Sequence, residues 1–259
     1  MMEQTFKEIT LVSGSTGAKI APARGGLVTS FSVNDTEILF LERATFNDVA
    51  QNVRGGLPLL FPNAGPLQGN LYQLPRHGFA RNTAWNLTEQ NQNSITLQLQ
   101  SGGNTKAIYP FDFTLELNVA ISGNQLTHNM TVTNIGDRPM PTAYGIHPYF
   151  KISQAEKHLL VSNIARFHAG KIDWTSEFDK SFPNPGRIQV RMPGKELTIE
   201  NDPALFQFVR IWHLAGKDFV CLEPWTRDNF ALDDLARSLW VEPQQSVNFS
   251  VAIRAGIPK

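Results

Sequence analysis

Hydrophobic and polar residues alternate with a period of two along most of the chain. The longest such run extends from Phe111 to Val119. Because successive side chains of a β-strand point to opposite faces, this alternation predicts strands with one buried face. Runs with the same period lie at residues 95–99, 111–119, 126–132, 188–192, 197–199 and 247–251.

Turn-forming clusters separate these runs, as expected for antiparallel hairpins. They are Ser101-Gly-Gly-Asn, Ser122-Gly-Asn and Asn134-Ile-Gly-Asp. A helical spacing of apolar residues occurs only from Ala231 to Leu239. Asp233 and Asp234 are predicted to lie on the solvated face of that helix.

Long helical segments between the strands are missing, which argues against a parallel βαβ fold and favours a large antiparallel β-sandwich. No linker, composition shift or repeat of fixed period interrupts the chain, and Pro183-Asn-Pro-Gly reads as a loop between strands. We therefore predict an all-β fold with few short helices and a single domain over residues 1–259.

The balance of charge narrows the classes of partner. The 259 residues carry a formal net charge of +0, so no basic field attracts nucleic acid or a membrane surface, and a small molecule fits better. Cys221 is the one cysteine and cannot form an internal disulfide. The first residues lack the apolar run of a secretion signal, and no stretch reaches the roughly 18 apolar residues of a membrane span. We expect a cytoplasmic protein.

Several common chemical motifs are missing from the sequence. A Walker loop, a GxGxxG turn, a CxxC pair and a GxSxG elbow do not occur. This removes the usual nucleotide, zinc and serine-hydrolase interpretations.

Residues 54–82 are the first of three segments without strand alternation. Four prolines restrict the backbone there, so a segment with little regular structure can still be rigid. Arg54, Arg76, His77 and Arg81 lie on it. Single arginines are mostly solvated, but this grouping indicates a binding site.

The other two segments each hold an ionisable side chain among apolar residues. Tyr144-Gly-Ile-His-Pro-Tyr-Phe contains His147, whose imidazole can exchange a proton near neutral pH. Val220-Cys-Leu-Glu-Pro-Trp-Thr contains Glu223. A carboxylate in apolar surroundings must be paired, hydrogen-bonded or protonated, and its raised pKa suits a general base. A buried structural histidine and a water-facing glutamate are the alternatives.

Taken in order, these segments resemble the aldose 1-epimerase, or galactose mutarotase-like, family over nearly the whole chain. RGGLPLLFP and HGFARNTAW resemble the N-terminal signature, GIHPYF the acid-histidine motif and CLEPW the catalytic glutamate motif. The resemblance implies a β-supersandwich, no metal and no organic cofactor, and interconversion of the α and β anomers of a sugar.

The resemblance also implies roles for the matching residues. Glu223 takes the proton of the C1 hydroxyl while His147 gives one to the ring oxygen. Rotation about the C1–C2 bond and reclosure then produce the other anomer. The positions expected to bind the substrate are His77, Arg54, Arg81 and Asp202.

Other aromatic and imidazole side chains receive a weaker interpretation. Trp225 and Phe79 could stack on a sugar face, although aromatic residues are more often part of the core. The histidines expected to be structural or exposed are His128, His158, His168 and His213.

Two substrate classes remain open at this point. We rank an unspecified aldose first and a hexose 6-phosphate second, because Arg54, Arg76 and Arg81 could converge on a phosphate. The motifs GIHPYF and CLEPW resemble the free-aldose branch of the family more closely.

Three other functions are alternatives. Glu223 and Asp202 could be the paired carboxylates of a glycoside hydrolase. His77, His147 and Glu223 could hold a metal. The chain could also be a sugar-binding module without turnover. The oligomeric state cannot be predicted.

Overall fold

A computed structural model describes residues 6–257 of the chain. The boundaries of the predicted domain, residues 1 and 259, lie outside this range. Within it, helices are short: two α-helices and five 3₁₀ helices. They are η1 (Pro22–Arg24), α1 (Arg43–Asn47), η2 (Ala80–Asn82), α2 (Gly103–Ile108), η3 (Gln154–Leu159), η4 (Ala169–Lys171) and η5 (Leu235–Arg237). No helix in residues 6–257 has the length and hydrophobicity needed to cross a bilayer.

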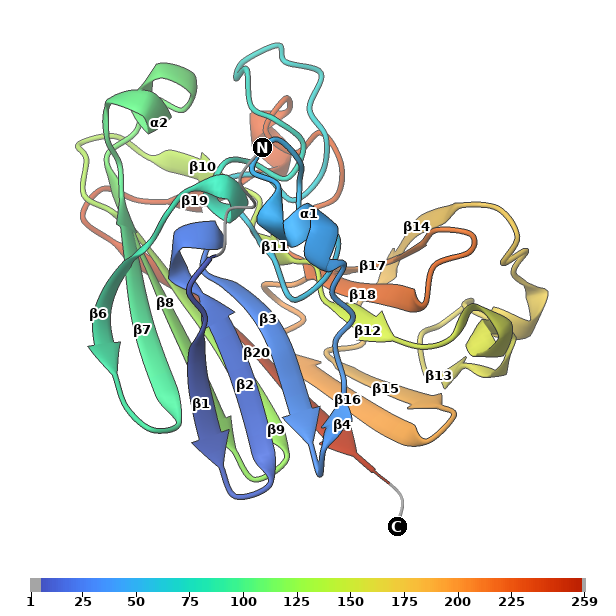
Figure 1. The fold of residues 1–259 in the computed structure, drawn as a ribbon. Coiled ribbons are helices and arrows are strands. Elements are labelled where there is room, and N and C mark those ends of the chain that lie inside the picture. The colour runs from blue at the N-terminus through green and yellow to red at the C-terminus, as the bar shows by residue number, and fades with distance from the viewer. Residues whose placement is uncertain (1–5, 258–259) are drawn as a thin grey trace.

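An eight-stranded antiparallel sheet forms the largest layer of the fold (Figure 1). Along the sheet its strands are β13 (Val161–Ser162), β15 (Arg187–Met192), β16 (Lys195–Asn201), β20 (Ser246–Gly256), β9 (Gln125–Asn134), β8 (Phe113–Ser122), β7 (Ser94–Gln100) and β6 (Asn86–Gln90). Strands β8 and β9 each bury every second side chain. The period of two in the sequence therefore sets which face of this sheet is buried.

Three smaller sheets complete the fold. A four-stranded sheet comprises β1 (Ile9–Ser13), β2 (Thr16–Ala21), β3 (Leu27–Val33) and β4 (Thr36–Glu37). A six-stranded sheet comprises β14 (Phe178–Pro183), β17 (Phe208–His213), β18 (Phe219–Trp225), β11 (Gly145–Ile146), β5 (Leu59–Leu60) and β12 (Tyr149–Lys151), which pairs with β18. A two-stranded sheet pairs β10 (Met140–Thr142) with β19 (Leu239–Val241).

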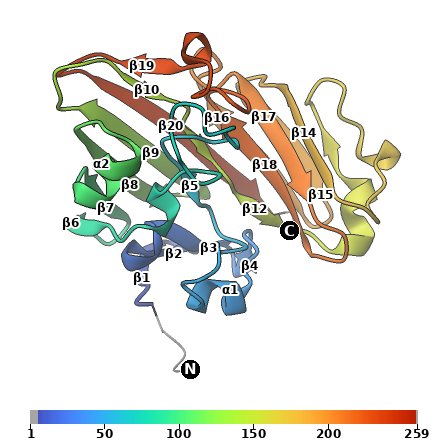
Figure 2. The same ribbon diagram turned by 90° about the horizontal axis from the view of Figure 1, so that it is seen from above.

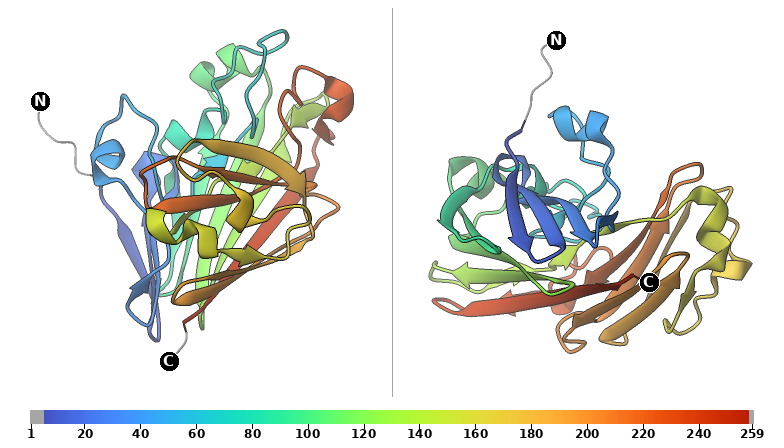
Figure 3. Two further views of the ribbon diagram at one scale, coloured as in Figure 1. Left: turned by 90° about the vertical axis from the view of Figure 1, so that its right-hand side faces the viewer. Right: turned by 60° about the horizontal axis from the view of Figure 1, so that its bottom comes forward.

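One hydrophobic cluster joins the three largest sheets. Phe31 of β3, Leu117 of β8 and Leu222 of β18 all belong to it. Seen from above, β14, β17 and β18 lie beside β15 and β16 (Figure 2). Strands β1 and β2 contact β8 of the large sheet, and Figure 3 shows the blue N-terminal strands beside its green strands. The prediction of a large antiparallel β-sandwich is confirmed.

The predicted helix from Ala231 to Leu239 is wrong. The segment forms turns and the single 3₁₀ turn η5, and β19 already begins at Leu239. The carboxylate of Asp234 accepts the backbone N–H of Ala236. Aspartate side chains compete in this way for local backbone donors, which favours turns over a helix interior.

Asp233 also differs from the prediction, which placed it on the solvated face of a helix. Its carboxylate accepts backbone N–H groups of Gln68 at 2.7 Å and Asn70 at 3.3 Å. These partners lie more than 160 residues away in the chain. Asp233 therefore fastens a loop of the proline-rich segment to the C-terminal part of the fold.

Candidate active site

Strand β18 carries Glu223 and is buried along its whole length. It lies between β17 on one side and the short strands β11 and β12 on the other. Glu223 is 1% exposed, and the side chains of Cys221 and Trp225, two residues away, share its face of the strand. Trp225 Nε1 donates to Glu223 Oε2 at 3.0 Å. The CLEPW motif thus places a buried carboxylate in the interior of a strand.

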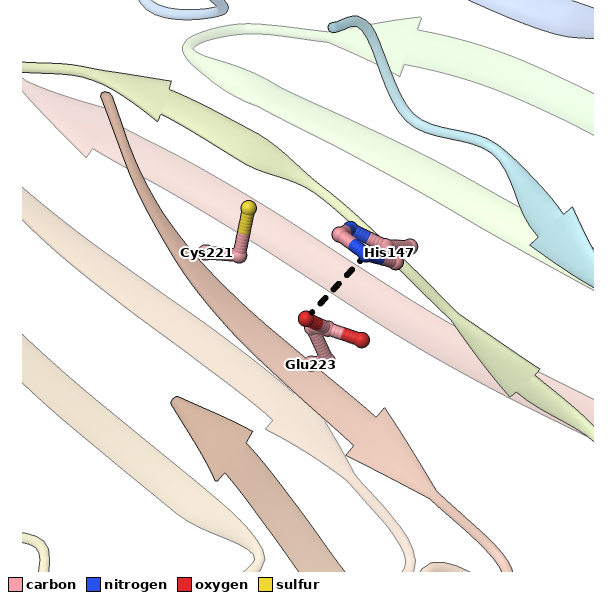
Figure 4. A group of neighbouring side chains, drawn as sticks. All are labelled: His147, Cys221 and Glu223. Atoms are coloured by element: carbon pink, nitrogen blue, oxygen red, sulfur yellow. Dashed lines mark ion pairs between the residues drawn. The ribbon is translucent and has the colours of Figure 1, made fainter. Parts of the chain in front are cut away.

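His147 reaches Glu223 from the connection between β11 and β12 (Figure 4). Its Nε2 lies 3.4 Å from Glu223 Oε1. The ring stacks on Tyr149 with centroids 4.7 Å apart and an interplanar angle of 12°. The backbone N–H of His147 donates to the carbonyl of Pro58, so the proline-rich segment fixes this turn.

His77 forms the next part of the site. Its Nδ1–H donates to the carbonyl of Ala64, which leaves Nε2 as an acceptor. Its ring centroid lies 5.3 Å from that of His147. The backbone here is left-handed, with φ of 71° at His77 and 69° at Gly78. A Cβ at Gly78 would lie 2.0 Å from the carbonyl oxygen of Phe61, so only glycine permits this turn.

Burial shifts the proton affinities of these groups strongly. Burial raises the pKa of Glu223 well above its ordinary value, and the negative charge of Asp179 raises it further. Burial lowers the pKa of His147 well below its ordinary value, with contributions from His77 and Arg81. For His77, burial and Arg81 lower the pKa to about 3, so this imidazole is neutral at physiological pH.

A cavity of about 210 Å³ brings these residues together with the arginines of the proline-rich segment. Arg54, Arg76, His77, Arg81, His147 and Glu223 all line it. The structure therefore brings together every expected catalytic, substrate-binding and phosphate-binding residue except one.

The three arginines of the cavity differ in their freedom to bind a ligand. Arg81 is 6% exposed, donates to the carbonyl of Val53 and hydrogen-bonds Tyr149. The side chain of Arg54 is 35% exposed and pairs with Glu42 at 2.9 Å. The side chain of Arg76 is 54% exposed. Arg54 and Arg76 can therefore change partners at the cavity opening, whereas Arg81 is fixed.

The exception is Asp202, which does not line the cavity. It is exposed and follows β16, where its carboxylate accepts the backbone N–H of Ala204 at 2.8 Å. Its backbone carbonyl accepts the N–H groups of Leu205 and Phe206. This is an aspartate turn of the kind that Asp-Pro sequences favour, so Asp202 acts here in local structure.

Asp179 of β14 supplies the cavity carboxylate that the sequence predicts at Asp202. It pairs with Arg76 at 3.3 Å and with Arg210 of β17. Asp179 and Arg210 lie in strands without a motif, so only the pairing of β14, β17 and β18 reveals them. The remaining cavity residues outside the sequence motifs are Asn52, Val53, Glu177 and Trp212.

Of the two aromatic residues that could stack on a sugar, one lines the cavity, and the four remaining histidines are buried or exposed as predicted. Trp225 lines the cavity, whereas Phe79 packs in the core and does not line it. His128 and His213 are buried, and His158 and His168 are exposed.

Metal ligation by this site is a further alternative, with His77 as one expected ligand. Among residues 6–257, the donor set that the structure brings together is instead His147, Cys221 and Glu223, whose donor atoms lie within 4.8 Å of one another. Burial and the neighbouring Glu223 raise the pKa of the Cys221 thiol, which disfavours the thiolate that a metal needs. Arg81 places a fixed positive charge on the same cavity. This donor set fits a cation poorly.

Comparison with known proteins places the chain in a family. The sequence profile of the family described as aldose 1-epimerase matches residues 7–171. The chain belongs to the aldose 1-epimerase family. It is an isomerase of a family that acts on sugars or sugar phosphates. The matched region includes His77 and His147 and ends before Glu223.

Individual relatives support the same family. A protein of Escherichia coli K12 described as a candidate glucose-6-phosphate 1-epimerase is 26% identical over 221 residues, which cover 78% of this chain and 68% of the relative. A protein of Salmonella typhimurium with the same description is 31% identical over 155 residues, covering 52% of this chain and about half (51%) of the relative.

Solved structures of this aldose 1-epimerase fold are similar over the whole chain. The Slr1438 protein of Synechocystis sp. PCC 6803 has a TM-score of 0.92 at 29% identity and covers 100% of this chain and 98% of its own. A GalM/aldose epimerase homologue of Caenorhabditis elegans has a TM-score of 0.78 at 11% identity, covering 98% and 100%, and supports the fold alone.

Proposed function

We propose that this aldose 1-epimerase opens and recloses the ring of an aldose with Glu223 as general base and His147 as general acid. One observation carries the proposal: a buried carboxyl group and a buried imidazole face each other at 3.4 Å on the wall of a sugar-sized cavity. His77 and Asp179 offer acceptors to sugar hydroxyls, and Arg81 offers donors.

The proposed proton transfers leave the total number of protons on the two side chains and the sugar unchanged. Glu223 takes the proton of the C1 hydroxyl as His147 gives one to the ring oxygen, and reclosure on the other face of C1 reverses both transfers. Burial raises the pKa of Glu223 and lowers that of His147. The proposed step starts from ionised Glu223 and protonated His147, and the nearby guanidinium of Arg210 lowers the pKa of Glu223 toward that form.

Saturation-transfer NMR of anomer exchange tests this proposal. Glucose and galactose are compared with and without the wild-type protein and the Glu223→Gln variant. We expect the wild type to accelerate exchange and the variant to bind sugar without acceleration. Acceleration retained by Glu223→Gln would contradict the role of Glu223, and binding without acceleration by the wild type would favour a sugar-binding module.

A hexose 6-phosphate is the second candidate substrate. Arg54 and Arg76 are partly exposed arginines at the cavity, and each can exchange its carboxylate partner for a phosphate. The bacterial relatives described as candidate glucose-6-phosphate 1-epimerases favour the same substrate class.

Arg76→Ala separates the two substrate classes. If the substrate is phosphorylated, this variant should lose about tenfold or more in kcat/KM for glucose 6-phosphate, since a charged hydrogen bond contributes roughly 1.5–3 kcal/mol. Its kcat/KM for glucose should change little. Arg254→Ala, at an exposed arginine of β20, is the matched control. An equal effect of Arg76→Ala on both sugars would contradict a phosphate contact.

A glycoside hydrolase is less consistent with this geometry. The expected partner of Glu223, Asp202, lies outside the cavity, and Asp179 is held between two guanidinium groups. Release of sugar from an aryl glycoside would contradict our interpretation. A cytoplasmic location stays a prediction from the sequence.

A further inference from the structure

Arg210 lies directly beside the proposed base. It is the register partner of Glu223 across β17 and β18, and its side chain is 10% exposed. Its guanidinium carbon lies 5.0 Å from the centre of the Trp225 ring. Because the same indole donates to Glu223, Arg210 acts on the base both through its charge and through the position of Trp225.

The guanidinium of Arg210 is held firmly from its other side. Nε donates to Asp179 Oδ1. Nη1 donates to Ser181 Oγ at 3.2 Å and to Asn229 Oδ1 at 3.3 Å, and it lies 3.6 Å from Asp228 Oδ1. A planar guanidinium group held by several acceptors keeps its position when a sugar binds in the cavity.

We propose that Arg210 is a positioning residue that, opposed by Asp179, sets the charge balance of the Glu223–His147 pair. Arg210 favours ionised Glu223 and holds Trp225 where it donates to that carboxylate. Asp179 opposes ionisation of Glu223 and anchors Arg210. This inference rests on the proposed roles of Glu223 and His147.

The other groups around Glu223 do not replace Arg210. The charged groups that act on it are Arg76, Arg81, Arg210 and Asp179. The titratable groups that are neutral by their shifted pKa values are His77, Tyr149 and Cys221, while His147 shares one proton with Glu223. Arg76 is more than half exposed and therefore screened by water.

The direction of the pH effect follows from the charges alone. Glu223 and His147 titrate as a coupled pair, and the active form carries one proton between them. Removing the cation of Arg210 makes every protonation of the pair easier, so the whole bell-shaped profile of kcat/KM moves to higher pH. Removing the anion of Asp179 moves it to lower pH. A charge at this range shifts such profiles by about one pH unit or more.

The experiment measures kcat/KM for mutarotation against pH in four variants and the wild type. Arg210→Met should move the profile to higher pH, Asp179→Asn to lower pH, and Arg210→Lys should leave it near that of the wild type. The double variant Arg210→Met/Asp179→Asn, which leaves neither charge unpaired, should return the profile toward the wild-type position.

This inference is supported if the pH profiles of Arg210→Met and Asp179→Asn shift in opposite directions. Profiles that do not move, or that move in the same direction in Arg210→Met and Asp179→Asn, would overturn it, even if all variants lose activity. Should Arg210→Met fail to fold, Asp179→Asn and the double variant give the same comparison. Activity retained by Glu223→Gln would instead overturn the proposed function, so the two failures are distinguishable.

Discussion

Strands β20 and β18 show two different uses of a β-strand in one molecule. β20 alternates buried and exposed residues over most of its length, and its outer face carries mostly polar side chains. β18 is buried on both faces, yet it contains Glu223. The difference lies in the neighbours, since β18 has chain packed on both of its faces and a cavity at its carboxylate.

The comparison shows where this fold keeps its chemistry. In the eight-stranded sheet, most polar groups point to water and apolar groups fill the core, with His128 of β9 among the buried exceptions. In the six-stranded sheet, a carboxylate and an imidazole are buried against each other at a cost in solvation. That burial raises the pKa of the Glu223 carboxyl group, as its proposed role of general base requires.

Glu223→Gln should have the largest effect on the site. Turnover should fall by at least about 100-fold, the low end of a general-base contribution, while the melting temperature stays close to that of the wild type or rises, because a buried carboxyl group becomes a neutral amide. Anomer-exchange NMR and calorimetry measure the two quantities. The same substitution in the regular sheet, Glu116→Gln at an exposed position of β8, is the control and should change neither.

Leu117→Ala should have the opposite effect to Glu223→Gln: it should lower stability and leave turnover nearly unchanged. Leu117 of β8 is fully buried in the shared core, so its truncation should cost about 2–5 kcal/mol of unfolding free energy. The kcat of the folded fraction should remain within about twofold of the wild type. Urea unfolding and single-turnover kinetics test this, and a kcat loss comparable to that of Glu223→Gln would show that the two regions are not separable.

Buried histidines should make the protein less stable in acid. Burial lowers the pKa of His128 to about 4, below the unfolded value near 6.5. The unfolded chain therefore binds the proton first, and stability falls as the pH drops from 6.5 toward 4. At pH 5 the loss is about 2 kcal/mol for one such group.

His128→Gln should remove this part of the pH dependence. Urea midpoints at pH 7 and pH 5 measure it, with exposed His168→Gln as the matched control. If both variants lose as much stability between pH 7 and pH 5 as the wild type, protonation of His128 in the unfolded chain is not the cause of that loss.

Asp202→Asn should have the smallest effect. An asparagine side chain keeps the acceptor for the Ala204 N–H, so kcat/KM should change by less than about twofold. Asp179→Asn should lower kcat/KM at its optimum by about tenfold, as expected for a lost charged hydrogen bond. Steady-state kinetics compare the two, and the reverse order would return Asp202 to the sugar site.

The sequence by itself determined many of the strands and predicted several of the residues that line the cavity. Alternation with a period of two predicts β8, β9 and β20 because a pleated strand has two faces. The short motifs predict His147 and Glu223 because each combines an ionisable residue with proline and aromatic neighbours. These signals are local, and the structure brings both side chains to one cavity.

Only the tertiary structure decided how the site is completed. Arg76 and Asp179 are 103 residues apart and meet across the cavity, and Arg210 faces Glu223 because β17 pairs with β18 in one register. The helical spacing near Ala231 gave way to contacts of Asp233 with a loop more than 160 residues away. Such contacts depend on how strands and loops pack, so no local pattern of residues contains them.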